Sequence, residues 1–206
     1  MKKYFFLFVV IMALATTVSA QSNAVETTLY KPNLKSQADS LKTKQTVGFS
    51  IDLLPIIMSI STGNLGYSGQ LWYGYNKFRI RGVIAGFQMP DKLMGNNDFK
   101  DLKTTATALI FDCFKNYNFK GWWLGAGVEM WNNTITSIID NNNYNFNNYV
   151  ATAGSGYIFK IYKNFYVEPW GAVHYILNNE KVSVGTTEYN TKKFQGEVSL
   201  KVGWHF

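Results

Sequence analysis

The feature that most constrains this chain is a strict two-residue alternation over residues 194–206. The even positions are apolar or glycine: Phe194, Gly196, Val198, Leu200, Val202, Trp204 and Phe206. The odd positions hold Gln195, Glu197, Ser199, Lys201, Gly203 and His205. Because side chains of a β-strand alternate between two faces, this pattern predicts a strand with one apolar and one polar face. We interpret it as the closing strand of a barrel that turns its apolar side chains toward lipid.

Seven preceding segments show the same alternation. They cover residues 46–59, 65–75, 78–88, 104–115, 121–131, 149–161 and 165–178. Pro55 interrupts the first segment and predicts a bulge or local break, since proline donates no ladder hydrogen bond. Strands of about 9–11 residues cross a bilayer when they are tilted. The sequence therefore predicts an all-β fold, an eight-stranded antiparallel up-and-down transmembrane β-barrel spanning residues 46–206.

The links between the segments alternate between short and long. Short turns join the strands near residues 75–78, 115–120 and 162–164, whereas the links at 89–103, 132–148 and 179–192 are long and rich in asparagine or charge. The link at residues 61–64 is short and breaks this alternation. Outer-membrane barrels have short periplasmic turns and longer extracellular loops. We therefore expect both termini in the periplasm.

The N-terminus has the features of an export signal. Two lysines precede an apolar run too short to span a membrane, and the run ends in small residues before Gln21. This pattern predicts a cleavable signal peptide at residues 1–20. Residues 21–45 are polar and lack a sustained period, which predicts a flexible periplasmic N-terminal segment. Export, alternating strands and a 17% aromatic content together indicate the outer membrane.

Charge and cysteine content exclude several classes of function. The net charge of +7 falls to +5 when Lys2 and Lys3 leave with the signal peptide, which leaves 18 basic against 13 acidic residues. The basic residues form no cluster, so a nucleic-acid partner is not expected. With one cysteine and two histidines, the chain predicts no disulfide, no metal site and no cofactor.

Aromatic residues concentrate at the strand ends near the short turns, where they predict a girdle at the lipid head groups. They are Tyr73, Tyr75, Phe78, Phe114, Phe119, Trp122, Phe159, Phe165, Trp204 and Phe206. A soluble barrel of the lipocalin type, with an apolar interior, has the same period. The terminal phenylalanine, the girdle and the asymmetry of the links favour the membrane barrel.

With these features, residues 46–206 resemble the small eight-stranded outer-membrane barrels of the outer-membrane protein A/X type. The closing strand is similar to the C-terminal signal that the barrel-assembly machinery reads, and the resemblance assigns this signal to Val202, Trp204 and Phe206. It implies the assembly machinery and outer-membrane lipid as partners. The chain departs from full-length protein A in lacking the peptidoglycan-binding domain.

The polar faces place many charged residues in the expected lumen. The predicted lumen charge network consists of Arg79, Arg81, Asp112, Glu129, Lys160, Glu168, His174, Glu197 and Lys201. Buried charges persist when they are paired, and side chains fill an eight-stranded barrel, so we expect a closed lumen. An alternative assigns His174 as a base oriented by Glu197 or Glu129. The sequence offers only Ser183 as a nucleophile near it, without a nucleophile motif.

The asparagine-rich stretch before the sixth segment supplies candidates for contact with a partner. Tyr144, Phe146 and Tyr149 are aromatic residues that could anchor such a contact. We expect a monomeric, non-enzymatic outer-membrane barrel with a structural or surface-interaction role through its extracellular loops. The alternatives are a narrow transport path for small or apolar solutes, based on inward Gly125, Gly127, Gly154 and Gly156, and a lipid-modifying enzyme.

Overall fold

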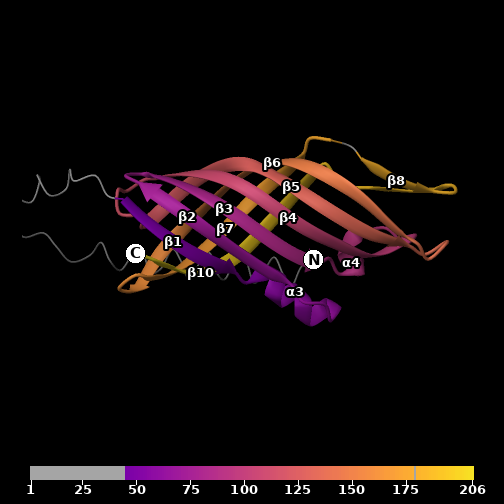
Figure 1. Cartoon of the computed structure of the whole chain (residues 1–206), viewed down its shortest axis with the longest axis horizontal. Coiled ribbons are helices and arrows are strands. Elements are labelled where there is room, and N and C mark those ends of the chain that lie inside the picture. The colour runs from indigo at the N-terminus through magenta and orange to yellow at the C-terminus, as the bar shows by residue number, and fades with distance from the viewer. Residues whose placement is uncertain (1–44, 179) are drawn as a thin grey trace, which may run out of the picture. The chain divides into compact units, whose positions relative to one another are not determined.

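The structure is a computed structural model that describes residues 45–178 and 180–206 (Figure 1). The predicted signal peptide and residues 21–44 of the predicted N-terminal segment lie outside the described residues. Eight antiparallel strands close into a barrel in the order β1-β10-β7-β6-β5-β4-β3-β2. They are β1 (Gln45–Asp52), β2 (Tyr67–Tyr75), β3 (Phe78–Gln88), β4 (Phe99–Phe114), β5 (Gly121–Ser137), β6 (Asn143–Tyr162), β7 (Phe165–Ile176) and β10 (Phe194–His205). This order confirms the predicted up-and-down eight-stranded barrel.

The two ends of the barrel differ in their connections. At one end, which we call the turn end, short turns join β2 to β3, β4 to β5 and β6 to β7. The first strand begins there and the last strand ends there, since the backbone N–H of Phe206 donates to the carbonyl of Val47 over 2.8 Å. The opposite end, which we call the loop end, carries two helices and a β-hairpin.

The first strand is shorter than the sequence predicted. It ends at Asp52, and helix α3 (Leu54–Thr62) replaces the expected second half of the strand. Pro55 lies in the first turn of this helix, where its missing N–H costs nothing. The backbone N–H of Leu54 donates to the Asp52 carboxylate over 3.0 Å, and Gly63 ends the helix in the left-handed region. The break predicted at Pro55 is therefore a change from strand to helix, and the short link predicted at residues 61–64 is part of a longer connection.

Two of the three long loops are shorter than predicted because the strands continue. β5 runs on to Ser137 and β6 begins at Asn143, so most of the asparagine-rich stretch is a hairpin. Threonine hydroxyls donate to asparagine side chains across it, from Thr134 to Asn145 over 2.7 Å and from Thr136 to Asn143 over 2.8 Å. Such cross-strand pairs stabilise strand structure in a composition that is otherwise typical of loops.

The loop end is folded around its own apolar core. Strands β8 (Lys181–Val184) and β9 (Thr187–Asn190) form a separate two-stranded sheet within the third predicted loop, and α4 (Asp91–Met94) lies within the first. Their buried side chains pack with those of the extended β4, β5 and β6. This loop-end core comprises Met94, Phe99, Leu102, Ile135, Phe146, Val182, Val184 and Tyr189.

The barrel is apolar outside and polar inside. Outward residues such as Leu71, Leu124 and Val128 are 73%, 69% and 59% exposed, whereas inward Arg79 and Glu168 are fully buried. Phe114 and Phe119, predicted in the outer girdle, are buried in the lumen instead. Phe114 is buried because it lies on the inward face of β4, as Asp112 does. No helix in the described part of the chain is long and apolar enough to cross a membrane.

Candidate functional site in the barrel lumen

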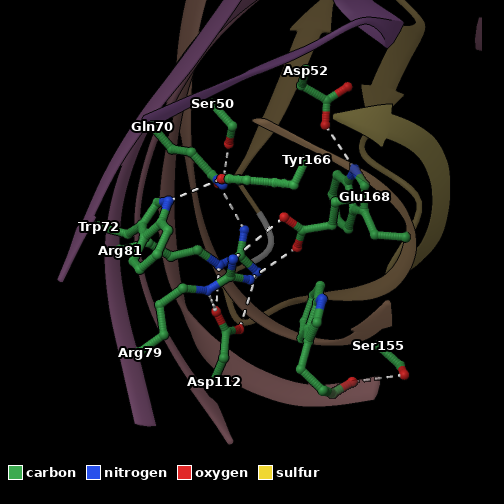
Figure 2. A network of polar contacts seen from close by, with 12 residues as sticks. Ser50, Asp52, Gln70, Trp72, Arg79, Arg81, Asp112, Ser155, Tyr166 and Glu168 are labelled. Carbon is green, nitrogen blue, oxygen red and sulfur yellow. Dashed lines mark hydrogen bonds and ion pairs between the residues drawn. The ribbon is translucent and has the colours of Figure 1, made fainter. Parts of the chain in front are cut away.

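The turn half of the lumen is organised around Arg79 (Figure 2). Its Nε lies 2.6 Å from Asp112 on the neighbouring β4. Its two terminal nitrogens reach Glu168 on β7, at 2.9 and 3.3 Å, as a bidentate pair. All three side chains are fully buried. Because removing either carboxylate would leave a buried charge uncompensated, this cluster fixes the packing of the lumen.

Arg81 extends the cluster toward β2 and β1. Its Nε lies 2.9 Å from Asp112, and its Nη1 donates to the side-chain oxygen of Gln70 over 3.0 Å. The amide nitrogen of Gln70 donates to Ser50 over 2.5 Å. A continuous chain of polar contacts therefore links five strands across the lumen (Figure 2).

Aromatic rings fill the space around the guanidinium of Arg79. Its central carbon lies 5.6, 5.1 and 5.2 Å from the ring centres of Trp72, Phe114 and Trp123. Trp72 donates its indole N–H to the hydroxyl of Tyr166 over 3.0 Å. We call the four charged residues Arg79, Arg81, Asp112 and Glu168, together with the buried cluster of Trp72, Phe114, Phe119, Trp123, Ile158 and Tyr166, the lumen plug.

Glycines let the bulky plug residues approach the wall. A Cβ at Gly156 would lie 2.7 Å from the Trp123 ring, and one at Gly125 would lie 2.1 Å from Asp112. These two inward glycines, which the transport alternative relied on, therefore face space that plug side chains occupy. In this half of the barrel the inward glycines make room for the plug side chains and open no path for solutes.

Lys201 lies at the seam between the first and last strands. It pairs in register with Asp52 of β1, is 3% exposed, and its ammonium lies 3.5 Å from the ring centre of Trp170. The indole of Trp170 donates to Asp52 over 2.8 Å, and the hydroxyl of Ser199 donates to the same carboxylate. These contacts close the barrel at the level where β1 ends.

A second charged group lies closer to the loop end. His174 on β7 stands between Glu129 on β5 and Glu197 on β10, with Nε2 3.2 Å from Glu197 and Nδ1 3.2 Å from Glu129. The Nδ1 contact lacks hydrogen-bond alignment. Trp131 donates its indole N–H to Glu129 over 2.6 Å, and its ring centre lies 5.4 Å from that of His174. We call Glu129, His174 and Glu197 the upper triad.

The structure thus divides the predicted charge network into separate groups. Lys160, on β6, is half-buried and interacts electrostatically with His205. Ser183 lies on an exposed face of the β8–β9 hairpin, opposite Glu188, and belongs to none of these charged groups. Within the described residues no set of three histidine, cysteine or acidic side chains is arranged to hold a metal ion.

The remaining candidates occupy different environments. Val202 and Trp204 lie on the outer face of β10, and Phe206, the residue after the end of this strand, is 69% exposed. Tyr149 is exposed on the outer face of β6, and Tyr144 donates its hydroxyl to Asp140 over 2.5 Å. Phe146 is buried in the loop-end core. The expectation of an exposed anchor at Phe146 was wrong, because this residue faces the packed side of the extended hairpin.

Sequence reasoning missed several uncharged residues in and around the lumen plug. Ser50, Trp72, Trp123 and Tyr166 complete the contacts of the charged cluster. Their positions in the two-residue pattern signalled this role, since each shares the parity of an inward polar residue on its own strand. A tryptophan on a polar face was the available clue.

The comparisons with known proteins bear on the fold. No family model and no curated protein sequence matches the chain. The N-terminal β-barrel domain of Pseudomonas aeruginosa OprF is similar with a TM-score of 0.52 and 13% identity, over 80% of this chain and 100% of that one. A major outer membrane protein from Thermus thermophilus is matched with a TM-score of 0.47 and 12% identity, over 80% and 99%. The chain has the fold of the small eight-stranded outer-membrane β-barrels.

Proposed function

We propose that the protein is an integral outer-membrane barrel that conducts no solutes and acts through a folded surface at its loop end. The exposed apolar side chains on every side of the barrel support the membrane location, because water would disfavour this surface and lipid accommodates it. The likeness to the OprF barrel domain supports the outer membrane as the bilayer.

The difference between the two ends supports an orientation with the turn end in the periplasm. With the turn end in the periplasm, both ends of the barrel sequence face the compartment from which such barrels are assembled. Val202, Trp204 and Phe206 then present their side chains outward at the periplasmic edge, where the barrel-assembly machinery would recognise them. The barrel would be a monomer surrounded by lipid.

The lumen plug is the observation that carries the non-conducting role. Arg79, Asp112 and Glu168 are fully buried and span the lumen between opposite walls, and six apolar or aromatic side chains fill the space around them. A solute crossing this level would have to break a fully buried bidentate ion pair, which costs about 3–5 kcal/mol.

The loop-end core supports a role in surface interaction. It gives the extracellular side a fixed shape built from α4, the β8–β9 hairpin and three strand extensions. Apolar side chains remain exposed around it, including Ile138 and Ile139 at the tip of the β5–β6 hairpin and Leu93 on α4. Tyr144 and Tyr149 remain the aromatic candidates for contact. A preformed surface loses less entropy on binding than a flexible loop does.

The membrane location and the closed lumen have separate tests. Membrane-extracted protein should migrate differently on a gel before and after boiling, as a stable barrel does, and planar-bilayer recordings should show no steady channels. Unchanged mobility together with soluble fractionation would contradict the membrane barrel. Steady conductance would contradict the plug and favour the transport alternative.

A lipid-modifying activity is the less supported alternative. His174 has carboxylates on both sides, which could orient it as a base. However, no serine or cysteine among the described residues lies in hydrogen-bond contact with it. Substitution of His174 by alanine should leave the envelope lipids unchanged. Altered lipid A or phospholipid would favour an enzyme.

A further inference from the structure

The connection from β1 to β2 differs in composition from the other connections at the loop end. Residues 53–66, which include α3, contain no charged side chain. The other loop-end connections carry Asp91 and Lys92 on α4, Asp140 at the tip of the β5–β6 hairpin, and Lys181 and Glu188 on the β8–β9 hairpin. Because charged side chains are the ones that most strongly prefer water, a connection without them is typical of a less polar environment.

The helix in this connection begins partway down the barrel wall. The backbone N–H of Leu53 donates to the carbonyl of Leu200 over 3.0 Å, and β10 starts at Phe194. The part of β10 from Phe194 to Leu200 therefore extends past the start of α3. With a rise of about 3.3 Å per residue and a tilt of about 40°, this part covers about 15 Å along the barrel axis. That length is roughly half of the hydrocarbon core of a bilayer.

The barrel wall beside α3 is apolar on its outer face. Phe194 and Val198 on the outward face of β10 are exposed, and so is Ile84 on β3. α3 contacts both of these strands. In Figure 1 α3 projects from the side of the barrel, whereas β8 lies further toward the loop end. Lipid that covers the outward side chains of β3 and β10 would therefore meet α3 as well.

α3 has one packed face and one exposed apolar face. Pro55 on the packed face is buried, whereas Ile56, Ile57 and Ile60 on the other face are exposed. Ile60 and Leu65, which follows the helix, are 84% and 86% exposed, more than any other large apolar side chain in the described part of the chain. Neighbouring apolar side chains that are exposed to this degree mark a contact surface.

The polar groups of α3 are satisfied within the chain. The hydroxyls of Ser59, Ser61 and Thr62 donate to backbone carbonyls of the same helix over 3.1, 2.9 and 3.1 Å. The backbone N–H of Gly63 closes the end of the helix by donating to the carbonyl of Ser59 over 2.9 Å. Hydrogen bonds of this kind are required in lipid, because no water is present there to satisfy a hydroxyl or a backbone group.

We propose that α3 is a membrane-embedded helix whose exposed face of Ile56, Ile57 and Ile60 contacts acyl chains of the lipid leaflet nearest the loop end. Lipid is the occupant of this face because the face is uncharged and lies beside outward apolar side chains of the wall. This assignment rests on the membrane barrel proposed above, and it extends the lipid contact from the strands to a helix.

A nitroxide attached to a single cysteine reports the surroundings of α3 directly. With Cys113 replaced by alanine, we would label Ile57→Cys, Ile139→Cys and Leu124→Cys variants of the purified chain in phosphatidylcholine vesicles. Ile57 and Ile139 are both 58% exposed, and Leu124 lies on the outward face of β5. Collisions with oxygen, which concentrates in the bilayer, should dominate at positions 57 and 124. Collisions with a water-soluble nickel chelate should dominate at position 139.

The Leu124 label separates the assignment of α3 from the membrane barrel. Dominant nickel collisions at position 57, with dominant oxygen collisions at position 124, would overturn the lipid contact of α3 and leave the membrane barrel intact. Dominant nickel collisions at both positions would contradict the membrane barrel and the assignment of α3 together.

A charge introduced into the exposed face provides a second test. Ile57→Lys places an ammonium in the lipid and should lower the equilibrium constant for folding in vesicles about tenfold, measured by urea titration of tryptophan fluorescence. Ile139→Lys is the matched control and should leave this constant unchanged. A face that awaits a protein partner would tolerate the charge in the purified chain. Equal constants for Ile57→Lys and the wild type would therefore overturn the lipid contact.

Discussion

Arg79 and Glu168 lie 89 residues apart in the chain and on opposite walls of the barrel, yet their side chains form a bidentate ion pair at 2.9 and 3.3 Å. Three strands separate β3 from β7 in either direction around the ring. The pair therefore crosses the lumen, and with Asp112 it braces three strands at once. This geometry makes the plug a part of the barrel's stability as well as a barrier.

Removal of the central cation should destabilise the barrel strongly. Arg79→Met keeps much of the side-chain volume but leaves Glu168 buried without its bidentate partner. We expect the free energy of unfolding to fall by about 3–5 kcal/mol, measured by urea titration of tryptophan fluorescence in lipid vesicles. Lys92→Met on exposed α4 is the control, and an unchanged urea midpoint for Arg79→Met would contradict the role of the plug.

One inward glycine should be intolerant of a methyl group. A Cβ at Gly203 would lie 2.4 Å from the Tyr166 ring and 2.6 Å from the backbone carbonyl of Phe49. Because a strand backbone in the seam has little freedom to move, Gly203→Ala should cost about 1–3 kcal/mol in the same unfolding experiment.

Gly82 offers the matched control for this substitution. A Cβ there meets no atom within 4 Å, so Gly82→Ala should leave the unfolding midpoint near that of the wild type. Equal effects of the two substitutions would show that the inward crowding at Gly203 does not limit stability.

The loop-end core should protect the β8–β9 hairpin from proteolysis. Phe146 is buried there and its ring centre lies 5.8 Å from that of Tyr189. Phe146→Ala removes this packing, so trypsin should cleave faster after Lys181 while the barrel keeps its heat-dependent gel shift. Tyr149→Ala, on the exposed outer face, should not accelerate cleavage. Equal rates for both variants would contradict an ordered loop end.

Asp140, at the tip of the β5–β6 hairpin, should titrate at an unusually low pH. The Tyr144 hydroxyl donates to Asp140 over 2.5 Å, and this hydrogen bond lowers the pKa of Asp140 from 3.8 to about 2. Because the bond favours the carboxylate, its stabilisation is complete above the ordinary pKa and is lost as the pH falls through about 2.

Tyr144→Phe tests this assignment. It should move the Asp140 midpoint back up toward 3.8, as followed by the carboxyl ¹³C resonance of the labelled protein. A midpoint that stays low in Tyr144→Phe would assign the shift to the remaining donors, chiefly the backbone and side-chain N–H groups of Asn142, each at 3.1 Å.

The C-terminal residue should affect assembly more than final stability. The backbone N–H of Phe206 bonds to Val47, and this contact survives truncation of the ring, which is 69% exposed. Phe206→Ala removes a side chain of the proposed assembly signal and should reduce the folded fraction in the envelope several-fold. The folded fraction is measured by the gel shift without boiling. Phe194→Ala, on the same face at the other end of β10, is the control. An equal folded fraction for Phe206→Ala and the wild type would exclude Phe206 from the assembly signal.

The sequence by itself determined the number of barrel strands, their up-and-down order and the polarity of each face. These properties are local, because a two-residue period assigns a side chain to a face wherever the strand lies. They placed Arg79, Asp112 and Glu168 inward without any knowledge of the register.

The tertiary structure decided which inward residues meet. The ion pair between Arg79 and Glu168 depends on the stagger of eight strands around a closed ring, which no local pattern contains. The same closure brought Phe114 against Arg79 in the lumen plug and packed Phe146 against the β8–β9 hairpin. It also ended the pairing of β10 with β1 at Lys201, where α3 replaces β1, because the length of a strand depends on what its partner offers as well as on its own sequence.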